Sequence, residues 1–264
     1  MSNLNLWRNN PMSTQPLPRP AEPERAPRAI RPLLRIVVLN AKGGCGKTTL
    51  STNLAGYYAS HDFHTAILDM DPQGSSLRWL ANRGQKRAPV TGIQGVERGA
   101  RVTRSFQLRI PPGTERLIVD TPAGLEPMRL QEITRGADAI LIPVLPSDID
   151  IHAASRCIAD LLIAGRIERR AGRVAVIANR VKKNTQMYDK LRRFLDTLEI
   201  PFVATFRDTQ NYVHASEQGI CVHELEARNA REDVRELNVL IDWIESRQQL
   251  SAMPDNSNIS TGIL

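Results

Sequence analysis

Short apolar segments alternate with longer stretches of helical spacing along most of the chain. Short, continuously apolar runs are typical of strands buried on both faces, whereas apolar positions that repeat every three to four residues are typical of helices. The predicted strands are residues 33–39, 65–69, 116–120, 139–144, 173–179 and 202–206. The predicted helices are residues 47–60, 127–136, 151–165, 184–198, 210–218 and 229–248. Their alternation predicts an α/β fold with a doubly wound, mostly parallel sheet and helices on both faces.

The two ends of the chain lack this pattern. Residues 1–32 hold seven of the 17 prolines and show no apolar periodicity, so we expect a disordered tail rich in proline and arginine. Residues 251–264 are polar and predict a flexible C-terminal tail. A single domain is expected over residues 33–250. Within it, residues 83–112 are rich in turn-forming residues and predict turns with one or two short strands.

Composition excludes several classes of protein. No apolar run approaches the roughly 20 residues that a membrane-spanning helix needs. The three cysteines, Cys45, Cys157 and Cys221, are scattered, which excludes a disulfide framework and a C-x-x-C metal site. The N-terminus shows no secretory signal, so we expect a cytoplasmic protein.

Positive charge is concentrated in one part of the chain. The formal net charge is +7, and residues 166–193 alone hold ten basic and two acidic residues. Residues 1–35 add six arginines against two glutamates, so the remainder of the chain is net negative. This uneven distribution favours a surface that binds a polyanion. A solvated basic surface with no partner is the alternative, and charge alone gives the two interpretations about equal weight.

A glycine-rich loop carries the clearest chemical signal. Residues 41–49 read Ala-Lys-Gly-Gly-Cys-Gly-Lys-Thr-Thr and stand between a predicted strand and a predicted helix. Glycines let consecutive backbone N–H groups turn toward phosphate oxygens, and the following helix adds the partial positive charge of its N-terminus. Lys47 is then placed to reach the β- and γ-phosphates, and the Thr48 hydroxyl to ligate Mg²⁺. The predicted cofactors are ATP and Mg²⁺.

The loop departs from the usual P-loop in one informative way. Ala41 stands where the first glycine is usual, and Lys42 directly precedes the glycine pair. This form resembles the ParA/MinD group of P-loop ATPases, whose extra lysine reaches the phosphates of the partner in a dimer that encloses two nucleotides. The resemblance covers about residues 35–247 and implies a homodimer. The nucleotide-binding residues that it implies in the loop are Gly43, Gly44, Cys45, Gly46, Lys47, Thr48 and Thr49.

Acidic residues follow two of the predicted strands. Residues 68–74 resemble the second acidic motif of the family, in which Asp71 corresponds to the carboxylate that positions the attacking water. Asp69 ends the predicted strand, whereas Asp71 lies beyond the strand end, where ligands bind in a doubly wound sheet, so the two carboxylates are not expected to share a task. Residues 117–124 resemble the Walker B strand and switch II, with Asp120 as the Mg²⁺ carboxylate. The expected catalytic residues are Lys42, Lys47 and Asp71, and the expected metal ligands are Thr48, Asp71 and Asp120.

The same resemblance implies where the base of the nucleotide binds. Asn179 matches the asparagine that ends a strand in the family and contacts the adenine edge. Arg207 and Asp208 fall, by a looser match, where the second base-contacting loop lies.

Several branches of the group are excluded by what the chain lacks. The cysteines are in the wrong places for the iron–sulfur members, and no C-terminal tyrosine cluster marks a tyrosine kinase. A MinD-like membrane helix is disfavoured because the apolar stripe from Val234 to Ile244 is accompanied by five acidic residues, and it is interpreted as core. No stable membrane association is therefore expected.

The remaining, ParA-like branch implies a slow ATPase that binds nucleoid DNA without sequence preference and is stimulated by a partner on its cargo. The cargo could be a plasmid, a chromosome region, a chemotaxis cluster or a carboxysome, and the short chain slightly favours the last two. The expected DNA contacts are Lys182, Lys183, Lys190, Arg192 and Arg193. A membrane-associated regulator and a metabolic ATP-using enzyme of the same fold remain as alternatives.

Overall fold

The computed structural model describes residues 31–95, 110–167, 172–182, 185–197 and 200–251. Every described element lies in the compact unit that begins at Pro32. The strands are β1 (Leu34–Val38), β2 (Thr65–Asp69), β3 (Val90–Gln94), β4 (Arg116–Asp120), β5 (Ala139–Val144), β6 (Val174–Val181) and β7 (Phe202–Arg207). The helices are α1 (Lys47–Ser60), α2 (Ser75–Asn82), α3 (Pro127–Thr134), α4 (Asp148–Ile163), α5 (Gln186–Asp196), α6 (Asn211–Glu217), the short 3-10 helix η3 (Val222–Glu224) and α7 (Ala227–Ser251).

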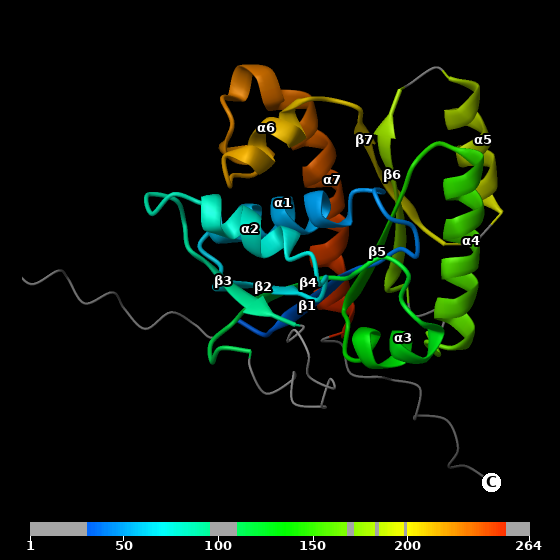
Figure 1. Ribbon diagram of the computed structural model, residues 1–264, viewed down its shortest axis with the longest axis horizontal. Coiled ribbons are helices and arrows are strands. Elements are labelled where there is room, and N and C mark those ends of the chain that lie inside the picture. Colours follow the sequence, from blue (N-terminus) through cyan, green and yellow to red (C-terminus); the bar gives the residue numbers. More distant parts are fainter. Residues whose placement is uncertain (1–30, 96–109, 168–171, 183–184, 198–199, 252–264) are drawn as a thin grey trace, which may run out of the picture. The chain divides into compact units, whose positions relative to one another are not determined.

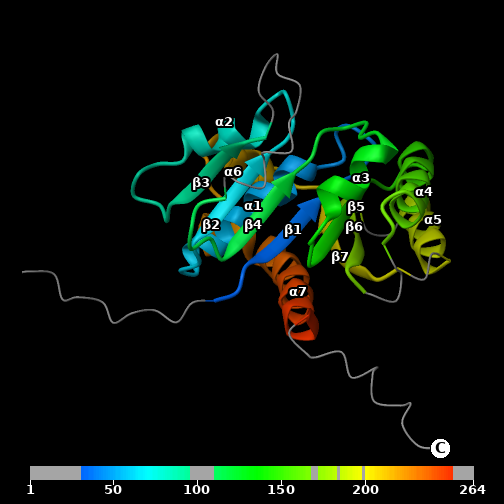
Figure 2. The ribbon, with the colours of Figure 1, turned by 90° about the horizontal axis from the view of Figure 1, so that it is seen from below.

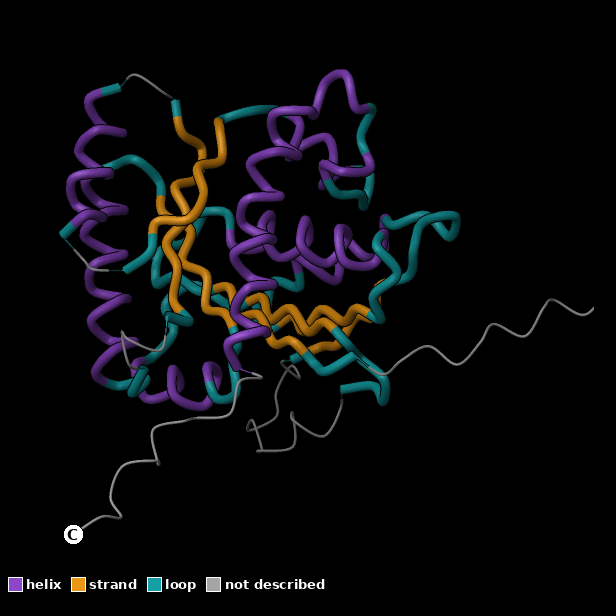
Figure 3. Tube along the Cα trace, turned by 180° about the vertical axis from the view of Figure 1, so that it is seen from behind, coloured by secondary structure: helices purple, strands orange, loops and turns teal. Residues whose placement is uncertain are grey.

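The strands of the described part form one parallel sheet in the order β3-β2-β4-β1-β5-β6-β7. Alternate side chains of each strand enter two different cores. Val37 of β1 packs in the core beneath α3, α4 and α5, whereas its neighbours Ile36 and Val38 pack in the core beneath α1, α2 and α7. Figure 1 shows these two groups of helices on opposite faces of the sheet, and Figures 2 and 3 show the strands as the layer between them. The predicted α/β fold is confirmed.

Most predicted elements match the structure closely. The predicted ranges of the first two strands and of the loop helix differ from β1, β2 and α1 by two residues at most. Within residues 83–112, one short edge strand, β3, is described, and residues 96–109 lie outside the described part. The expected tails, residues 1–32 and 251–264, also lie almost entirely outside it.

The sequence pattern missed helix α2. This helix has only eight residues, and its N-cap is Gly74, which offers no side chain to the free N–H groups. The carboxylate of Asp69, at the end of β2, supplies the missing acceptor: its Oδ2 accepts from the N–H groups of Ser76 and Leu77, at 3.1 Å each. Because a residue outside the helix caps it, no local capping signal marks its start.

The apolar stripe of α7 belongs to the core, as expected. Its buried side chains, which pack against the sheet, are Leu237, Leu240, Ile241 and Ile244. These side chains are therefore not available to a lipid surface. Among the described residues, no helix is long and apolar enough to cross a membrane.

Candidate nucleotide site

The phosphate loop lies between β1 and α1, at the carboxyl end of the central strands. Gly44 and Gly46 have positive φ angles of 77° and 98°, a left-handed conformation that other residues adopt only with strain. Gly46 is also crowded, since a Cβ there would lie 2.1 Å from the amide nitrogen of Asn179. Helix α1 begins at the next residue, Lys47, so that its N-terminus faces the loop.

The two lysines of the loop are linked through the backbone. The ammonium group of Lys47, which is 7% exposed, donates to the carbonyl oxygen of Lys42 at 2.9 Å. The N–H of Lys42 donates in turn to Oδ1 of Asn40 at 3.0 Å, and Asn40 is held by the carbonyl of Pro143. Lys42 itself is half-buried. These hydrogen bonds therefore fix the backbone of the loop between the two lysines.

Asp69 and Asp120 end neighbouring strands and stand opposite each other in the register of β2 and β4. Asp120 is fully buried, and its two carboxylate oxygens accept from Ser51 at 3.3 Å and from Ser76 at 3.0 Å. Burial raises the pKa of Asp120 to about 6, and the nearby Asp69 adds to the shift, whereas the hydroxyls of Thr48, Ser76 and Ser51 oppose it. A cation beside Asp120 would offset the cost of keeping this buried carboxylate charged.

Asp71 has a different environment from Asp69, because it lies beyond the end of β2. Asp69 is 1% exposed and accepts from backbone N–H groups, including that of Asp71 at 3.0 Å. Asp71 lies beyond the end of β2 and is half-buried, and its carboxylate accepts from the N–H of Gln73 at 2.9 Å. Asp69 is thus used to hold the backbone, and Asp71 is accessible for chemistry.

The donor set fits Mg²⁺ bound together with a nucleotide. Among the described residues, no group of three or more His, Cys, Asp or Glu side chains is placed to hold a metal by itself. Mg²⁺ in nucleotide sites takes one or two carboxylates, a hydroxyl and phosphate oxygens, and keeps several waters. Thr48, Asp120 and Asp71 are the residues that would supply the protein part of that set.

A cavity of about 340 Å³ adjoins the first turn of α1. Thr49, Asn179 and Asp208 line it together with α6 residues such as Tyr212. The hydroxyl of Tyr212 is buried and has no hydrogen-bond partner among the described residues. The volume is that of a small-molecule pocket, and its position beside the loop suits the base and ribose of a nucleotide. We call it the base cavity.

The structure refines the expectations for the base-contacting residues. Asn179 lies at the cavity, and its side chain also braces the loop, because Nδ2 donates to the carbonyl of Cys45 at 2.8 Å. Arg207 lines the cavity as well, but Asp233 of α7 holds its guanidinium at 2.6 and 2.8 Å. The Cys45 side chain is fully buried beneath the loop, so only its backbone is available to a nucleotide.

Sequence reasoning missed Ser51, Ser76 and Tyr212. Ser51 lies one turn after Lys47 on α1, so its spacing could have placed it near the phosphate loop. Ser76 and Tyr212 come from α2 and α6, and only the tertiary structure brings them to the site.

A parallel sheet with a lysine-bearing glycine loop at its carboxyl edge and buried aspartates beside it defines a P-loop nucleotide-binding domain. Residues 36–222 match the family model "CobQ/CobB/MinD/ParA nucleotide binding domain". The chain therefore belongs to this family, and the predicted resemblance to ParA/MinD ATPases is confirmed.

Two curated relatives match over most of their length. "Maintenance of carboxysome distribution protein A" of Halothiobacillus neapolitanus is 28% identical over 79% of this chain and 95% of its own. The protein with the same name from Gloeobacter kilaueensis is 30% identical over 75% of this chain and 87% of its own.

Solved structures support the fold. A putative plasmid partition protein of Borrelia burgdorferi bound to AMPPNP has a TM-score of 0.62 at 15% identity, and the match covers 80% of this chain and 99% of the other. A variant of Cyanothece McdA in complex with ATP has a TM-score of 0.59 at 17% identity, and the match covers 85% of this chain and 98% of the other.

Burial of the Asp120 carboxylate gives a prediction about stability. The pKa of Asp120 rises from 3.8 to about 6 on folding, so the charged form is disfavoured in the folded protein. Below pH 3.8 the carboxyl is neutral in both states, and its cost to stability develops as pH rises to about 6. In the absence of nucleotide, Asp120→Asn is therefore expected to raise the free energy of unfolding by roughly 1–3 kcal/mol at pH 7.5.

Urea denaturation at pH 7.5 and at pH 3.5 measures this effect. The gain should shrink at the lower pH, where both side chains are neutral. Asp160→Asn on the other face of the sheet is the control and should change little at either pH. A loss of stability at pH 7.5 would contradict the assignment of Asp120 as a carboxylate that destabilises the nucleotide-free fold.

Proposed function

We propose that this protein is a positioning ATPase whose two subunits close over two ATP molecules. The closed dimer binds DNA without sequence preference, and hydrolysis stimulated by a partner on the cargo releases it. The observation that carries this proposal is the presence of Lys42 beside Lys47 in one braced phosphate loop. One lysine serves the nucleotide of its own subunit, and the other is left to serve the nucleotide of a second subunit.

The residues of the chain divide the work of hydrolysis. The N–H groups of residues 43–49 and the ammonium of Lys47 bind the phosphates. Bound Mg²⁺ would supply charge neutralisation at the β- and γ-phosphates, with Thr48, Asp71 and Asp120 as the residues that would hold it. Asp71 stands at the edge of the site, where it can orient a water for attack on the γ-phosphate.

The names of the two curated relatives favour a carboxysome-type protein compartment as the cargo. We therefore expect a cytoplasmic protein that lies over the nucleoid, and an activating protein attached to the compartment. Fluorescence microscopy of the tagged protein tests the location. A signal at the cell envelope, together with co-sedimentation with anionic liposomes, would instead support the membrane-regulator alternative.

We expect several basic side chains of residues 166–193 to contact DNA, because they are exposed. Lys182, Lys190, Arg192 and Arg193 are exposed, and Lys183 lies outside the described residues. Two of them have acidic neighbours: Lys182 is 3.8 Å from Asp208, and Lys190 is paired with Asp148 of α4. Arg192 and Arg193 on α5 are therefore the stronger candidates within this window.

The first turns of α7 add a second basic group. Arg228, Arg231 and Arg235 are exposed and, by their spacing of three and four residues, lie on one face of the helix. With Arg207 they line a shallow cavity of about 480 Å³, where Glu232 is the acidic residue. Clustered arginines that face solvent suit phosphate oxygens better than isolated lysines do. Charge reversal separates the two basic groups experimentally.

Two double variants are each expected to lower the affinity for random DNA roughly 100-fold with ATP present. One is Arg231→Glu/Arg235→Glu on α7, and the other is Arg192→Glu/Arg193→Glu on α5. Nucleotide affinity should not change, because neither pair lines the base cavity. The measurement is an electrophoretic mobility shift at several salt concentrations, where the wild type should weaken steeply with salt.

The matched control is Lys86→Glu/Arg87→Glu, which changes the charge equally at exposed positions outside both groups. If both reversed pairs bind DNA like the control, the DNA-binding part of the proposal is wrong. If the protein binds DNA equally well with ATP and with ADP, the proposed control of DNA binding by ATP is wrong.

A further inference from the structure

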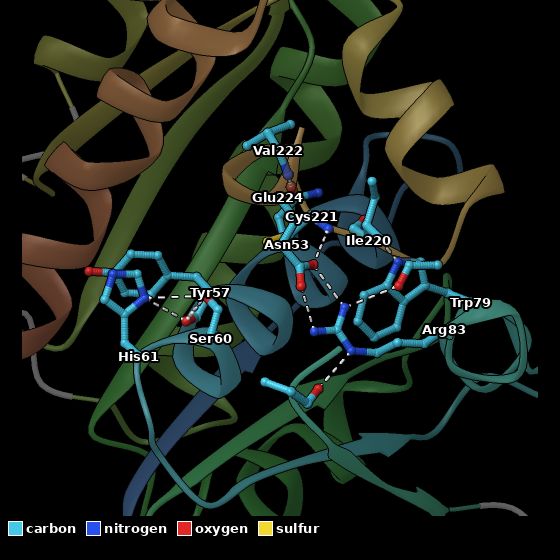
Figure 4. Close-up of polar contacts among 12 residues, drawn as sticks. Asn53, Tyr57, Ser60, His61, Trp79, Arg83, Ile220, Cys221, Val222 and Glu224 are labelled. Atoms are coloured by element: carbon cyan, nitrogen blue, oxygen red, sulfur yellow. Dashed lines mark hydrogen bonds and ion pairs between the residues drawn. The ribbon is translucent and has the colours of Figure 1, made fainter. Parts of the chain in front are cut away.

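Helix α2 connects the catalytic carboxylates to the wall of the base cavity. Its N-terminal turn carries Ser76, whose hydroxyl donates to Asp120, and two N–H groups from which Asp69 accepts. Its other end reaches the segment between α6 and α7, some 140 residues later in the chain (Figure 4). An eight-residue helix is short and stiff, so a displacement of one end is transmitted to the other.

The distal end of α2 is held by Arg83. Its Nη1 and Nη2 donate to the two carboxylate oxygens of Glu224, at 2.8 Å each, and Nη1 also donates to the carbonyl of Gly219 at 3.1 Å. The side chains of Arg83 and Glu224 are 3% and 8% exposed. Figure 4 shows this bidentate pair beside the ring of Trp79. The two parallel hydrogen bonds fix the orientation of the guanidinium, and removing one partner of such a buried pair leaves an uncompensated charge.

Close packing adds to this hold. The indole N–H of Trp79 donates to the carbonyl of Ile220 at 3.1 Å, and the Trp79 side chain is buried. Gly219 has a φ of 66°, and a Cβ there would lie 2.4 Å from the backbone nitrogen of Arg83. Without space between the two segments, a shift of the turn at Gly219 must move the end of α2 as well.

The turn held by Arg83 directly continues α6, which forms one wall of the base cavity. Tyr212, Ser216 and Glu217 of α6 line this cavity, and the carbonyl of Glu217 accepts from Asn82 at 3.4 Å. The path from the cavity to Asp120 thus runs through α6, the turn at Gly219, Arg83 and Ser76.

We propose that Arg83 is a positioning residue for hydrolysis, which acts through α2 when a base fills the cavity. Helix α2 holds Asp120 through Ser76, and it holds the backbone of Asp71 indirectly, through the carboxylate of Asp69. This inference depends on the proposed function in one respect, namely that the base of ATP occupies this cavity. It adds that binding of the base, and not of the triphosphate alone, sets the positions of the carboxylates beside the γ-phosphate.

Replacing Arg83 tests the proposal. Arg83→Met keeps the length of the stem and removes the bidentate pair, so kcat for ATP should fall by at least roughly tenfold while Kd for ATP stays within about threefold. Arg83→Lys keeps the charge and should recover part of kcat. Arg87→Met, at an exposed position four residues later, should leave both constants unchanged.

A purely structural role would lower the melting temperature of Arg83→Met without changing kcat at temperatures well below melting. That result, or a parallel change of Kd and kcat, overturns the proposal.

A second measurement leaves Arg83 in place. In a chain carrying Trp7→Phe and Trp243→Phe, Trp79 is the remaining tryptophan and reports on the contact with Arg83. ATP should change its emission, whereas inorganic tripolyphosphate, which lacks a base, should not. Equal responses to both compounds, or no response to bound ATP, overturn the proposal. Failure to bind or hydrolyse ATP at all would instead refute the proposed function, so the two failures are distinguishable.

Discussion

Replacement of Lys42 by alanine is expected to abolish ATP-dependent pairing of subunits while each subunit still binds ATP. In the proposed function, Lys47 and the backbone of the loop hold the phosphates of the subunit's own nucleotide, and neither contacts the Lys42 side chain, because Lys47 donates to the backbone carbonyl of Lys42. A dimer that encloses two nucleotides would lose two charge-assisted contacts at once, each worth about 2–3 kcal/mol. Dimer affinity should therefore fall by roughly 10³-fold or more, and hydrolysis should fall with it.

Analytical ultracentrifugation with a slowly hydrolysed ATP analogue measures the pairing. Lys86→Ala, an exposed lysine far from the loop in sequence, is the matched control and should pair like the wild type. Lys47→Ala gives the contrasting result, because it should lose nucleotide binding itself. If Lys42→Ala forms dimers as readily as the wild-type protein, the proposed role of Lys42 in ATP-dependent dimerisation is wrong.

Asp71→Ala is expected to stop hydrolysis but not pairing. The Asp71 carboxylate accepts from one backbone N–H, that of Gln73, whereas Asp69 accepts from three, so the loss of Asp71 should disturb the loop and α2 far less. The rate of ATP hydrolysis should fall roughly 10²–10³-fold, as it does when an orienting or charge-stabilising group is removed from other enzymes. The proposed function has hydrolysis release the dimer from DNA, so the variant should remain on DNA after wild-type protein has left it.

Single-turnover hydrolysis and the lifetime of the DNA complex after dilution measure the two effects. Asp62→Asn, at an exposed turn after α1, is the control. Asp69→Asn should behave differently from Asp71→Ala, since it weakens three bonds to backbone N–H groups and should lower stability. Turnover of Asp71→Ala at the wild-type rate would exclude Asp71 from catalysis.

Much of the fold could be predicted from the chain because its signals are local. Apolar runs such as residues 139–144 match β5, and the helical spacing of residues 47–60 matches α1. The glycines and lysines of the phosphate loop are adjacent in sequence, so their common role could be inferred without coordinates. Asp71 could be separated from Asp69 because it follows the predicted end of the strand at residue 69, where ligands bind in a parallel sheet.

Other features depend on contacts between distant residues and had no local signal. Helix α2 is capped by Asp69 of β2 and held by Glu224 of η3, so its own eight residues did not predict it. Arg207 was expected from its position to face a base, but a carboxylate on α7, 26 residues later, holds its guanidinium.

The amino-acid sequence by itself determined the phosphate loop, the alternation of strands and helices, and the family. These properties follow from spacings within about ten residues, which backbone geometry translates directly into local structure. Only the tertiary structure decided which hydroxyls hold Asp120, how α2 joins the base cavity to the carboxylates, and which arginines of α7 gather beside Arg207. Those arrangements arise from the packing of elements far apart in the chain, where no short pattern records which residues will meet.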